Sequence, residues 1–272
     1  RQMCIRDRLK PVKDDDNAYQ KLFGPESEFI NSSNVTSNYR FFREKLRSTP
    51  LDADQVWKAI CRLEVMHLDL EEYDEPQRIF ESLNSTGLEL KEADKIRNYV
   101  LMGLDSTQQE RLYNERWNPI EDNCNFQTDS FIRWYLTTYT TKTPREQDVY
   151  EAFKSFASKR KTNMTELLDD LFAYSKYFRE IRESDTGYHE VDTQLKRMNE
   201  FMGAVVLPFL MPLLRDVHES KTTPDDFLEV LLTIESYIVR RFVTGIPTNS
   251  LNKIFATMYA VSYTHLTLPT KA

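Results

Sequence analysis

The chain has 272 residues, of which 40% are hydrophobic and 12% aromatic, and this composition supports a packed core and argues against disorder. Its formal net charge of −7 argues against a broad, non-specific nucleic-acid surface, because such a surface needs a basic stripe. The three cysteines show neither metal-ligand nor disulfide spacing, and the longest apolar run, residues 204–214, is shorter than the ~20 residues of a membrane span. We therefore expect a cytoplasmic protein with no membrane partner.

Both ends of the chain, residues 1–8 and 261–272, look like translated sequencing-adapter read-through. Like an expression tag, they are expected to have no packed role in the fold. The alternative is that they are ordinary disordered termini. They carry net charges of +2 and +1, so the remaining body has a net charge of −10. The pattern of this body becomes almost purely helical after Leu104, which predicts one module over residues 9–104 and a helical bundle or connector over residues 105–260.

The first 70 residues predict helices followed by one strand. Apolar residues at helical spacing favour helices over residues 14–23, 38–46 and 52–62. Residues 63–70 alternate in the manner of a strand, with apolar residues in both alternating sets. His67 in this strand has no second histidine or cysteine nearby, which favours a structural role over a metal ligand or base. The expected fold class is mainly α, with a truncated α+β portion that holds one clear strand and is followed by a helical bundle.

Residues 75–104 form the stretch around which the rest is organised, and they predict a short helix, a polar loop and a second helix. Gly87 can take the positive φ that such a loop demands. A polar loop that runs into a helix N-terminus is suited to hold an anion such as phosphate. The alternative is a connection whose polar residues only cap helices. The residues in question are Asn84 and Gly87 in the loop and Asp94, Arg97 and Asn98 on the second helix.

The rest of the chain predicts further helices and places one of them, over residues 204–214, in the centre of the bundle because it is apolar all round. A helix that begins at Thr223 carries Arg240 and Arg241 near its end. These two arginines are either ordinary partners of the helix dipole or contacts to nucleotide or DNA phosphate. The other helices are expected over residues 106–117 (stopping before Pro119), 126–139, from Thr143 onward, 164–182, from about 189 to 202, and 251–259.

The string IFESLNSTGLELKEADKIRNYVLM, residues 79–102, resembles the Phe-x-x-x-Asn-x-x-Gly-x-x-Leu-x-x-x-Asp motif of the GmrSD-type restriction endonuclease N-terminal domain family. Residues 234–255 resemble the linker helix that precedes the nuclease half in these proteins, so the resemblance spans about residues 10–259. Lys91 departs from the family, which usually has Ser or Thr there as an N-cap acceptor worth ~1 kcal/mol, and leaves Asp94 to serve the first turn. The matching positions are Phe80, Asn84, Gly87, Leu90, Asp94 and Asn98, with Arg97 where the family usually has lysine.

The resemblance implies that residues 9–104 are the C-terminal part of a ParB-like nucleotide-hydrolysing module that uses an NTP with Mg²⁺. It further implies nucleotide binding by Asn84, Gly87, Asp94, Arg97 and Asn98, with DNA bound through the full-length protein. The family's Asp-Gly-Gln-Gln-Arg motif and its His-Asn-His nuclease motif do not occur in this chain. We therefore expect an internal fragment without catalytic residues or metal ligands of its own.

The function implied by the resemblance is that of a prokaryotic NTP-dependent restriction endonuclease, active in defence against phage and directed at modified DNA. This fragment would contribute part of the nucleotide site and the helical connector. The alternative is a non-catalytic helical interaction scaffold. A DNA-binding module is a third interpretation, which the net charge of −10 for the body disfavours.

Overall fold

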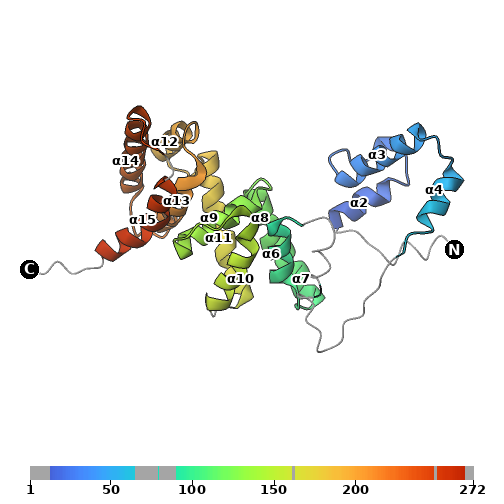
Figure 1. The fold of residues 1–272 in the computed structure, drawn as a ribbon, viewed down its shortest axis with the longest axis horizontal. Helices are drawn as coiled ribbons and strands as arrows, with labels where there is room; N and C mark the ends of the chain where they lie inside the picture. Colours follow the sequence, from blue (N-terminus) through green and yellow to red (C-terminus); the bar gives the residue numbers. More distant parts are fainter. Residues whose placement is uncertain (1–12, 65–78, 80–89, 161–162, 248–249, 267–272) are drawn as a thin grey trace, which may run out of the picture. The chain divides into compact units, whose positions relative to one another are not determined.

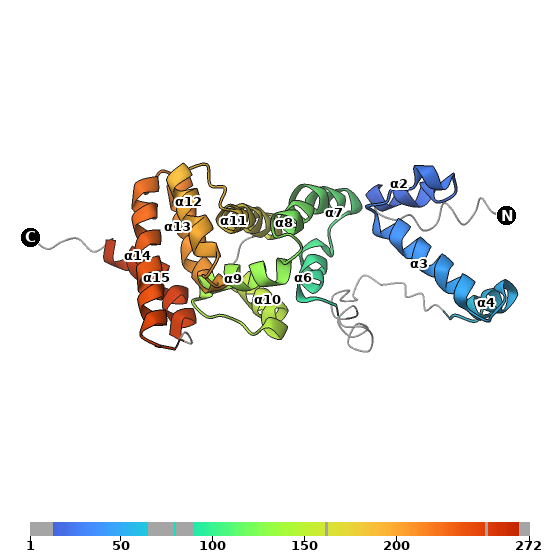
Figure 2. The ribbon, with the colours of Figure 1, turned by 90° about the horizontal axis from the view of Figure 1, so that it is seen from above.

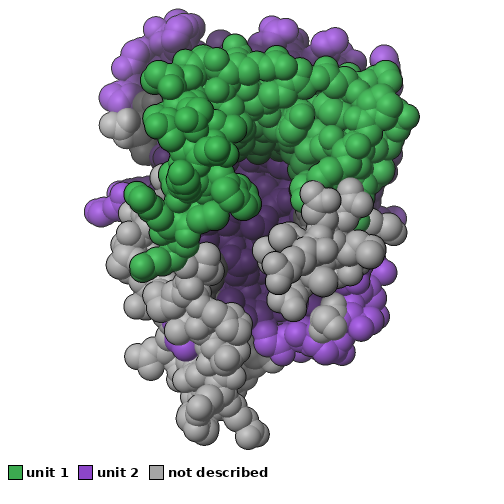
Figure 3. Space-filling view, turned by 90° about the vertical axis from the view of Figure 1, so that its right-hand side faces the viewer, with its two compact units in different colours: residues 1–70 green, residues 71–272 purple. Residues whose placement is uncertain are grey.

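The computed structural model describes residues 13–64, 79, 90–160, 163–247 and 250–266. Within these residues every regular element is a helix (Figure 1). By its contacts the chain divides into two compact units, residues 1–70 and 71–272, which Figure 3 colours separately.

The expected α+β portion is wrong, because the described part of the chain contains helices and no strand. Leu63 and Glu64, the first residues of the expected strand, lie in neither a helix nor a strand, and residues 65–70 lie outside the described residues, as does His67. The alternation over residues 63–70 did not predict the structure correctly, because both alternating sets contain apolar residues and the pattern therefore does not define one buried face. A strand also needs a neighbouring strand to pair its backbone N–H and C=O groups.

Unit 1 consists of short helices with good local signals and little core. Ser33 caps one of them by accepting a hydrogen bond from the Val35 amide, and Asp52 and Gln55 form a capping box at another. The hydrophobic residues that are buried among the described residues of this unit are Ala18 and Phe29. The elements are α2 (Lys13–Lys21), the 3₁₀ turn η1 (Glu26–Glu28), α3 (Asn34–Ser48) and α4 (Ala53–Ile60).

Unit 2 is a bundle of helices that share one hydrophobic core (Figures 1 and 2). The α-helices are α6 (Glu92–Leu101), α7 (Ser106–Leu112), α8 (Asn118–Asn123), α9 (Thr128–Thr140), α10 (Val149–Arg160), α11 (Met164–Glu183), α12 (His189–Asn199), α13 (Leu207–His218), α14 (Pro224–Val243) and α15 (Leu251–Leu266). A π-helical turn, η2 (Tyr113–Trp117), and two 3₁₀ turns, η3 (Glu146–Asp148) and η4 (Ala204–Val206), join some of them. None of the described helices combines the length and the apolar character needed to cross a membrane.

Helix α13 lies in the middle of this bundle, which confirms the prediction for residues 204–214. It packs against α9, α11, α14 and α15, and it buries most of its residues. Pro208 occupies its first turn, where the missing N–H is tolerated, while Pro212 lies inside the helix.

Pro119 does not end the helical path as expected. The chain continues from α7 through the π-helical turn η2 directly into α8, where Pro119 sits in the first turn. The wider turn brings Trp117 fully into the core, and its indole Nε1 donates a hydrogen bond of 2.7 Å to Glu121 Oε1. A π-helical turn immediately before proline removes the conflict that proline creates inside an α-helix.

Candidate functional site

Helix α6 begins without a side-chain cap of its own, because Lys91 stands at its N-cap position. The cap comes from another helix instead. Asp129, in the first turn of α9, accepts a hydrogen bond of 2.6 Å from the Ala93 amide through its Oδ1, across 36 residues of sequence. The sequence left this role to Asp94, which in the structure pairs with Arg97.

Glu92 extends the same arrangement from α6 to α10. Its Oε2 accepts a hydrogen bond of 2.7 Å from the Tyr150 amide in the first turn of α10, and its Oε1 lies 2.8 Å from Lys95 Nζ. One carboxylate of α9 therefore caps α6, and one carboxylate of α6 caps α10. Each such cap is worth about 1 kcal/mol, and together they fix three helix N-termini near one another.

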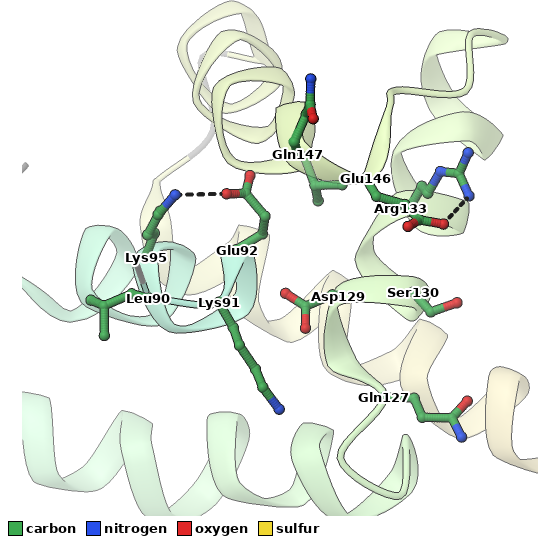
Figure 4. A pocket seen from close by; sticks show the side chains of 11 residues that line it. Leu90, Lys91, Glu92, Lys95, Gln127, Asp129, Ser130, Arg133, Glu146 and Gln147 are labelled. Atoms are coloured by element: carbon green, nitrogen blue, oxygen red, sulfur yellow. Dashed lines mark hydrogen bonds and ion pairs between the residues drawn. The ribbon is translucent and has the colours of Figure 1, made fainter. Parts of the chain in front are cut away.

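A pocket of about 590 Å³ lies where α6 and α9 begin, beside η3 (Figure 4). Its volume is in the range of pockets that bind small ligands of nucleotide size. In Figure 4 the Asp129 carboxylate points from α9 toward the first turn of α6. The pocket is lined by Leu90, Lys91, Glu92, Lys95, Gln127, Asp129, Ser130, Arg133, Glu146, Gln147 and Val149.

The charges around this pocket are mixed, but most of them already have partners. Glu92 and Asp129 serve as caps, and Arg133 lies 3.5 Å from Glu146 and donates to the Pro144 carbonyl at 2.8 Å. Lys91 is exposed and has no ion-pair partner among the described residues. It is therefore the positive side chain most available to an anion at the start of α6.

The structure brings together two of the residues expected to bind nucleotide. Arg97 lies 3.0 Å from Asp94 and 3.4 Å from Glu121 of α8, so its guanidinium is shared by two carboxylates. Asp94, Arg97 and Asn98 are half-buried and do not line the pocket, which faces the side of α6 that carries Glu92 and Lys95. Asn84 and Gly87 lie outside the described residues. Nucleotide binding by these residues stays a prediction.

The two arginines near the end of α14 differ in their surroundings. Arg241 donates to Tyr237 Oη at 3.0 Å, to Ser250 Oγ at 2.9 Å and to the Pro247 carbonyl, so it ties the end of α14 to the start of α15. Arg240 is exposed. The geometry gives Arg241 a structural role, and contact of either residue with phosphate stays a prediction.

Sequence reasoning missed Asp129 and the basic residues around the pocket. An acidic residue in the first turn of a helix ordinarily complements that helix's own dipole, so nothing local marks Asp129 as the cap of α6. The one available signal was the unsuitable N-cap residue Lys91, which showed that α6 needed an acceptor from elsewhere.

No cluster of three or more His, Cys, Asp or Glu side chains with the spacing of a metal site occurs among the described residues. His218 at the end of α13 hydrogen-bonds Glu180 Oε2 at 2.7 Å and stacks on Tyr177 at 5.5 Å between ring centroids. His218 is exposed, and its partners are one carboxylate and one ring, which gives it a structural role at the end of α13.

Residues 5–101 match the family model of the GmrSD restriction endonuclease N-terminal domain. The match confirms the resemblance for this part of the chain, which is less than half of its length and ends with the last residue of α6. Comparisons with curated proteins and with solved structures gave no significant match.

Proposed function

We propose, from the family match of residues 5–101, that this chain is part of an NTP-dependent restriction endonuclease that defends prokaryotic cells by cutting modified phage DNA. The match supports membership of a restriction endonuclease family. NTP dependence, the modified DNA and the role of this piece are our proposal. In it, α6 contributes to the nucleotide site and the bundle from α7 to α15 is the connector toward the nuclease half.

The observation that carries the nucleotide site is the start of α6. Its N-cap residue is Lys91, which is exposed and has no ion-pair partner among the residues that the structure describes, and the cap of the Ala93 amide comes from Asp129. A pocket of about 590 Å³ opens beside this helix start. Helix N-termini bind phosphate through their amides and their positive dipole end. We propose that Lys91 contacts the phosphates beside this pocket. We propose further that Asn84, Gly87, Asp94, Arg97 and Asn98 contribute from outside it, since the three on α6 lie on another side of that helix.

The described residues contain no cluster of three or more His, Cys, Asp or Glu side chains that could hold a metal ion, so we propose that Mg²⁺ binds together with the triphosphate. Mg²⁺ in nucleotide sites is held by one or two carboxylates together with phosphate oxygens. Glu92 and Asp129 are occupied as caps and Asp94 pairs with Arg97, so we propose no metal ligand from these carboxylates, and Mg²⁺ would be held by the phosphate oxygens. When bound, Mg²⁺ would screen the charge of the phosphates.

The proposal is tested by titrating the 272-residue chain with fluorescent ATP, GTP, CTP and UTP analogues in Mg²⁺. We expect Lys91→Glu and Arg97→Ala each to weaken binding by about 10-fold or more, since a hydrogen bond to a charged group is worth roughly 1.5–3 kcal/mol. Lys196→Glu on α12 is the matched control, because it makes the same charge change on an exposed lysine of another helix. If no analogue binds, or if the α6 variants bind like the control, the nucleotide site is wrong.

The second candidate is a non-catalytic helical scaffold. It is favoured by the engagement of Asp94, Arg97 and Glu121 with one another and by the use of Glu92 and Asp129 as caps. A scaffold predicts that the α6 variants lower the stability of the fold without changing nucleotide binding. The free energy of unfolding of the same variants, measured with a chemical denaturant beside the nucleotide titration, distinguishes the nucleotide site from the scaffold.

A further inference from the structure

The outer face of α14 is exposed over its whole length. The opposite face buries Phe227, Leu231 and Ile234 in the core, so α14 is well anchored. In Figures 1 and 2 it lies at one edge of unit 2, where it packs on α12 and α13. The residues that this outer face exposes are Glu229, Leu232, Thr233, Ser236, Val239 and Arg240.

The apolar residues of this face follow one side of the helix at spacings of seven and four residues. Leu232 is 44% exposed, Val239 43% and Val243 77%. Contiguous exposed apolar residues with a polar rim are typical of protein–protein contacts. The spacing of Glu229, Thr233, Ser236 and Arg240 (four, three and four residues) places them on one polar seam along the helix, beside the apolar residues.

The charges on this seam are arranged so that the face complements itself. Glu229 lies toward the beginning of α14 and Arg240 lies three turns later on the same face. Both side chains are exposed, and neither has an ion-pair partner among the described residues. A second α14 laid antiparallel on the first places each glutamate opposite the arginine of the other copy, whereas a parallel arrangement places like charges together.

We propose that this face binds a second copy of the chain, with the two α14 helices antiparallel about a two-fold axis between Thr233 and Ser236. The small side chains at the axis allow close approach of the helices. Leu232 then packs beside Val239 of the second copy, because the two-fold axis brings the same side of each helix together. Because a two-fold interface uses the same patch twice, each favourable pair occurs twice.

The test measures the mass of the 272-residue chain by sedimentation equilibrium over roughly 5–200 µM, the range of weak protein association. We expect the wild-type chain to form dimers in this range. Val239→Asp should abolish them, and E229R and R240E should each weaken them by about 10-fold or more, because each puts like charges opposite one another. Glu190→Arg on α12 is the matched control and should dimerise like the wild type. Far-UV circular dichroism shows that each variant is folded.

The mixture of E229R and R240E is the decisive measurement. The first variant has a wholly basic seam and the second a wholly acidic one, so each should be monomeric alone while the equimolar mixture forms heterodimers. A wild-type chain that is monomeric at the highest concentration overturns the proposal, and so does a mixture that stays monomeric. Neither result bears on nucleotide binding at α6, which the titration above tests separately.

Discussion

Helix α4 of unit 1 and helix α9 of unit 2 both carry apolar residues at helical spacing, yet their surroundings differ. Trp57 on α4 is 64% exposed, and α4 buries none of its residues. On α9, Phe131 and Tyr135 are fully buried among rings of α10 and α11. An apolar stripe shows that a helix has a face to cover, but it does not show whether that face is covered within its own unit.

The difference also separates two sources of stability. Unit 1 relies on local signals such as the capping box at Asp52, whereas unit 2 adds a continuous core and side chains that join distant helices. Most helix stability in proteins comes from packing of the apolar face. Unit 2 should therefore dominate the free energy of unfolding, and the following substitutions test that expectation.

The largest difference in the free energy of unfolding is expected between Phe131→Ala and Trp57→Ala. Phe131 is fully buried, with its ring centroid 5.4 Å from that of Phe178, so its removal should lower the free energy of unfolding by about 3–5 kcal/mol. Trp57→Ala should change it by less than about 1 kcal/mol. Urea unfolding followed by circular dichroism measures both. Similar losses in the two variants would show that Trp57 is covered in solution.

A second contrast compares neighbouring aspartates of α11. Asp170 accepts hydrogen bonds from Tyr135 at 2.6 Å and Tyr139 at 2.8 Å, and it lies 2.8 Å from Arg160. Asp170→Ala should therefore cost about 1–3 kcal/mol, because it leaves partly buried donors unpaired. Asp169→Ala, which removes an exposed pair with Arg116, should cost less than about 1 kcal/mol. Equal losses would mean that the tyrosine network adds nothing.

A third comparison concerns the stability that is lost when a helix cap is removed. In one variant the cap comes from another helix, and in the other it comes from the helix's own N-cap residue. Asp129→Ala removes the acceptor of the Ala93 amide and should lower the stability of unit 2 by about 1 kcal/mol. Asp52→Ala removes the capping box of α4 and should leave the unfolding of unit 2 unchanged, because that helix belongs to unit 1. With Trp57 replaced by phenylalanine, tryptophan fluorescence comes from Trp117 and Trp134 and therefore reports on unit 2. An unaffected midpoint for Asp129→Ala would contradict the cap.

The smallest change in the free energy of unfolding is expected when the pH is raised. Burial, and then the neighbouring Asp170, raise the pKa of Tyr139 to about 12, whereas an unfolded tyrosine titrates near its ordinary value of 10.0. The folded state therefore keeps its proton while the unfolded state loses it, so stability is full below pH 10 and falls as the pH rises toward 12. At pH 10.5 this loss is below about 1 kcal/mol. Tyr139→Phe should show a smaller loss between pH 9 and 10.5 than the wild type.

Several features of unit 2 follow from local sequence alone. Thr223 and Asp226 form the capping box that starts α14, where a helix beginning at Thr223 was predicted, and the helix predicted over residues 164–182 is α11. Pro119 was misread because a π-helical turn depends on where Trp117 can be buried. At the candidate site, the sequence singled out α6 and its polar residues, but the acceptor that caps α6 lies 36 residues away.

The sequence by itself determined where most helices run and which family the first part of the chain matches, because helix periodicity, caps and motifs are written in residues a few positions apart. Only the tertiary structure decided that Asp129 caps α6 and that Glu92 caps α10. It alone showed that α14 leaves a charged and apolar face open while α13 is enclosed. These outcomes depend on which helices become neighbours, and a neighbour distant in sequence leaves no periodic signal in the segment that it covers.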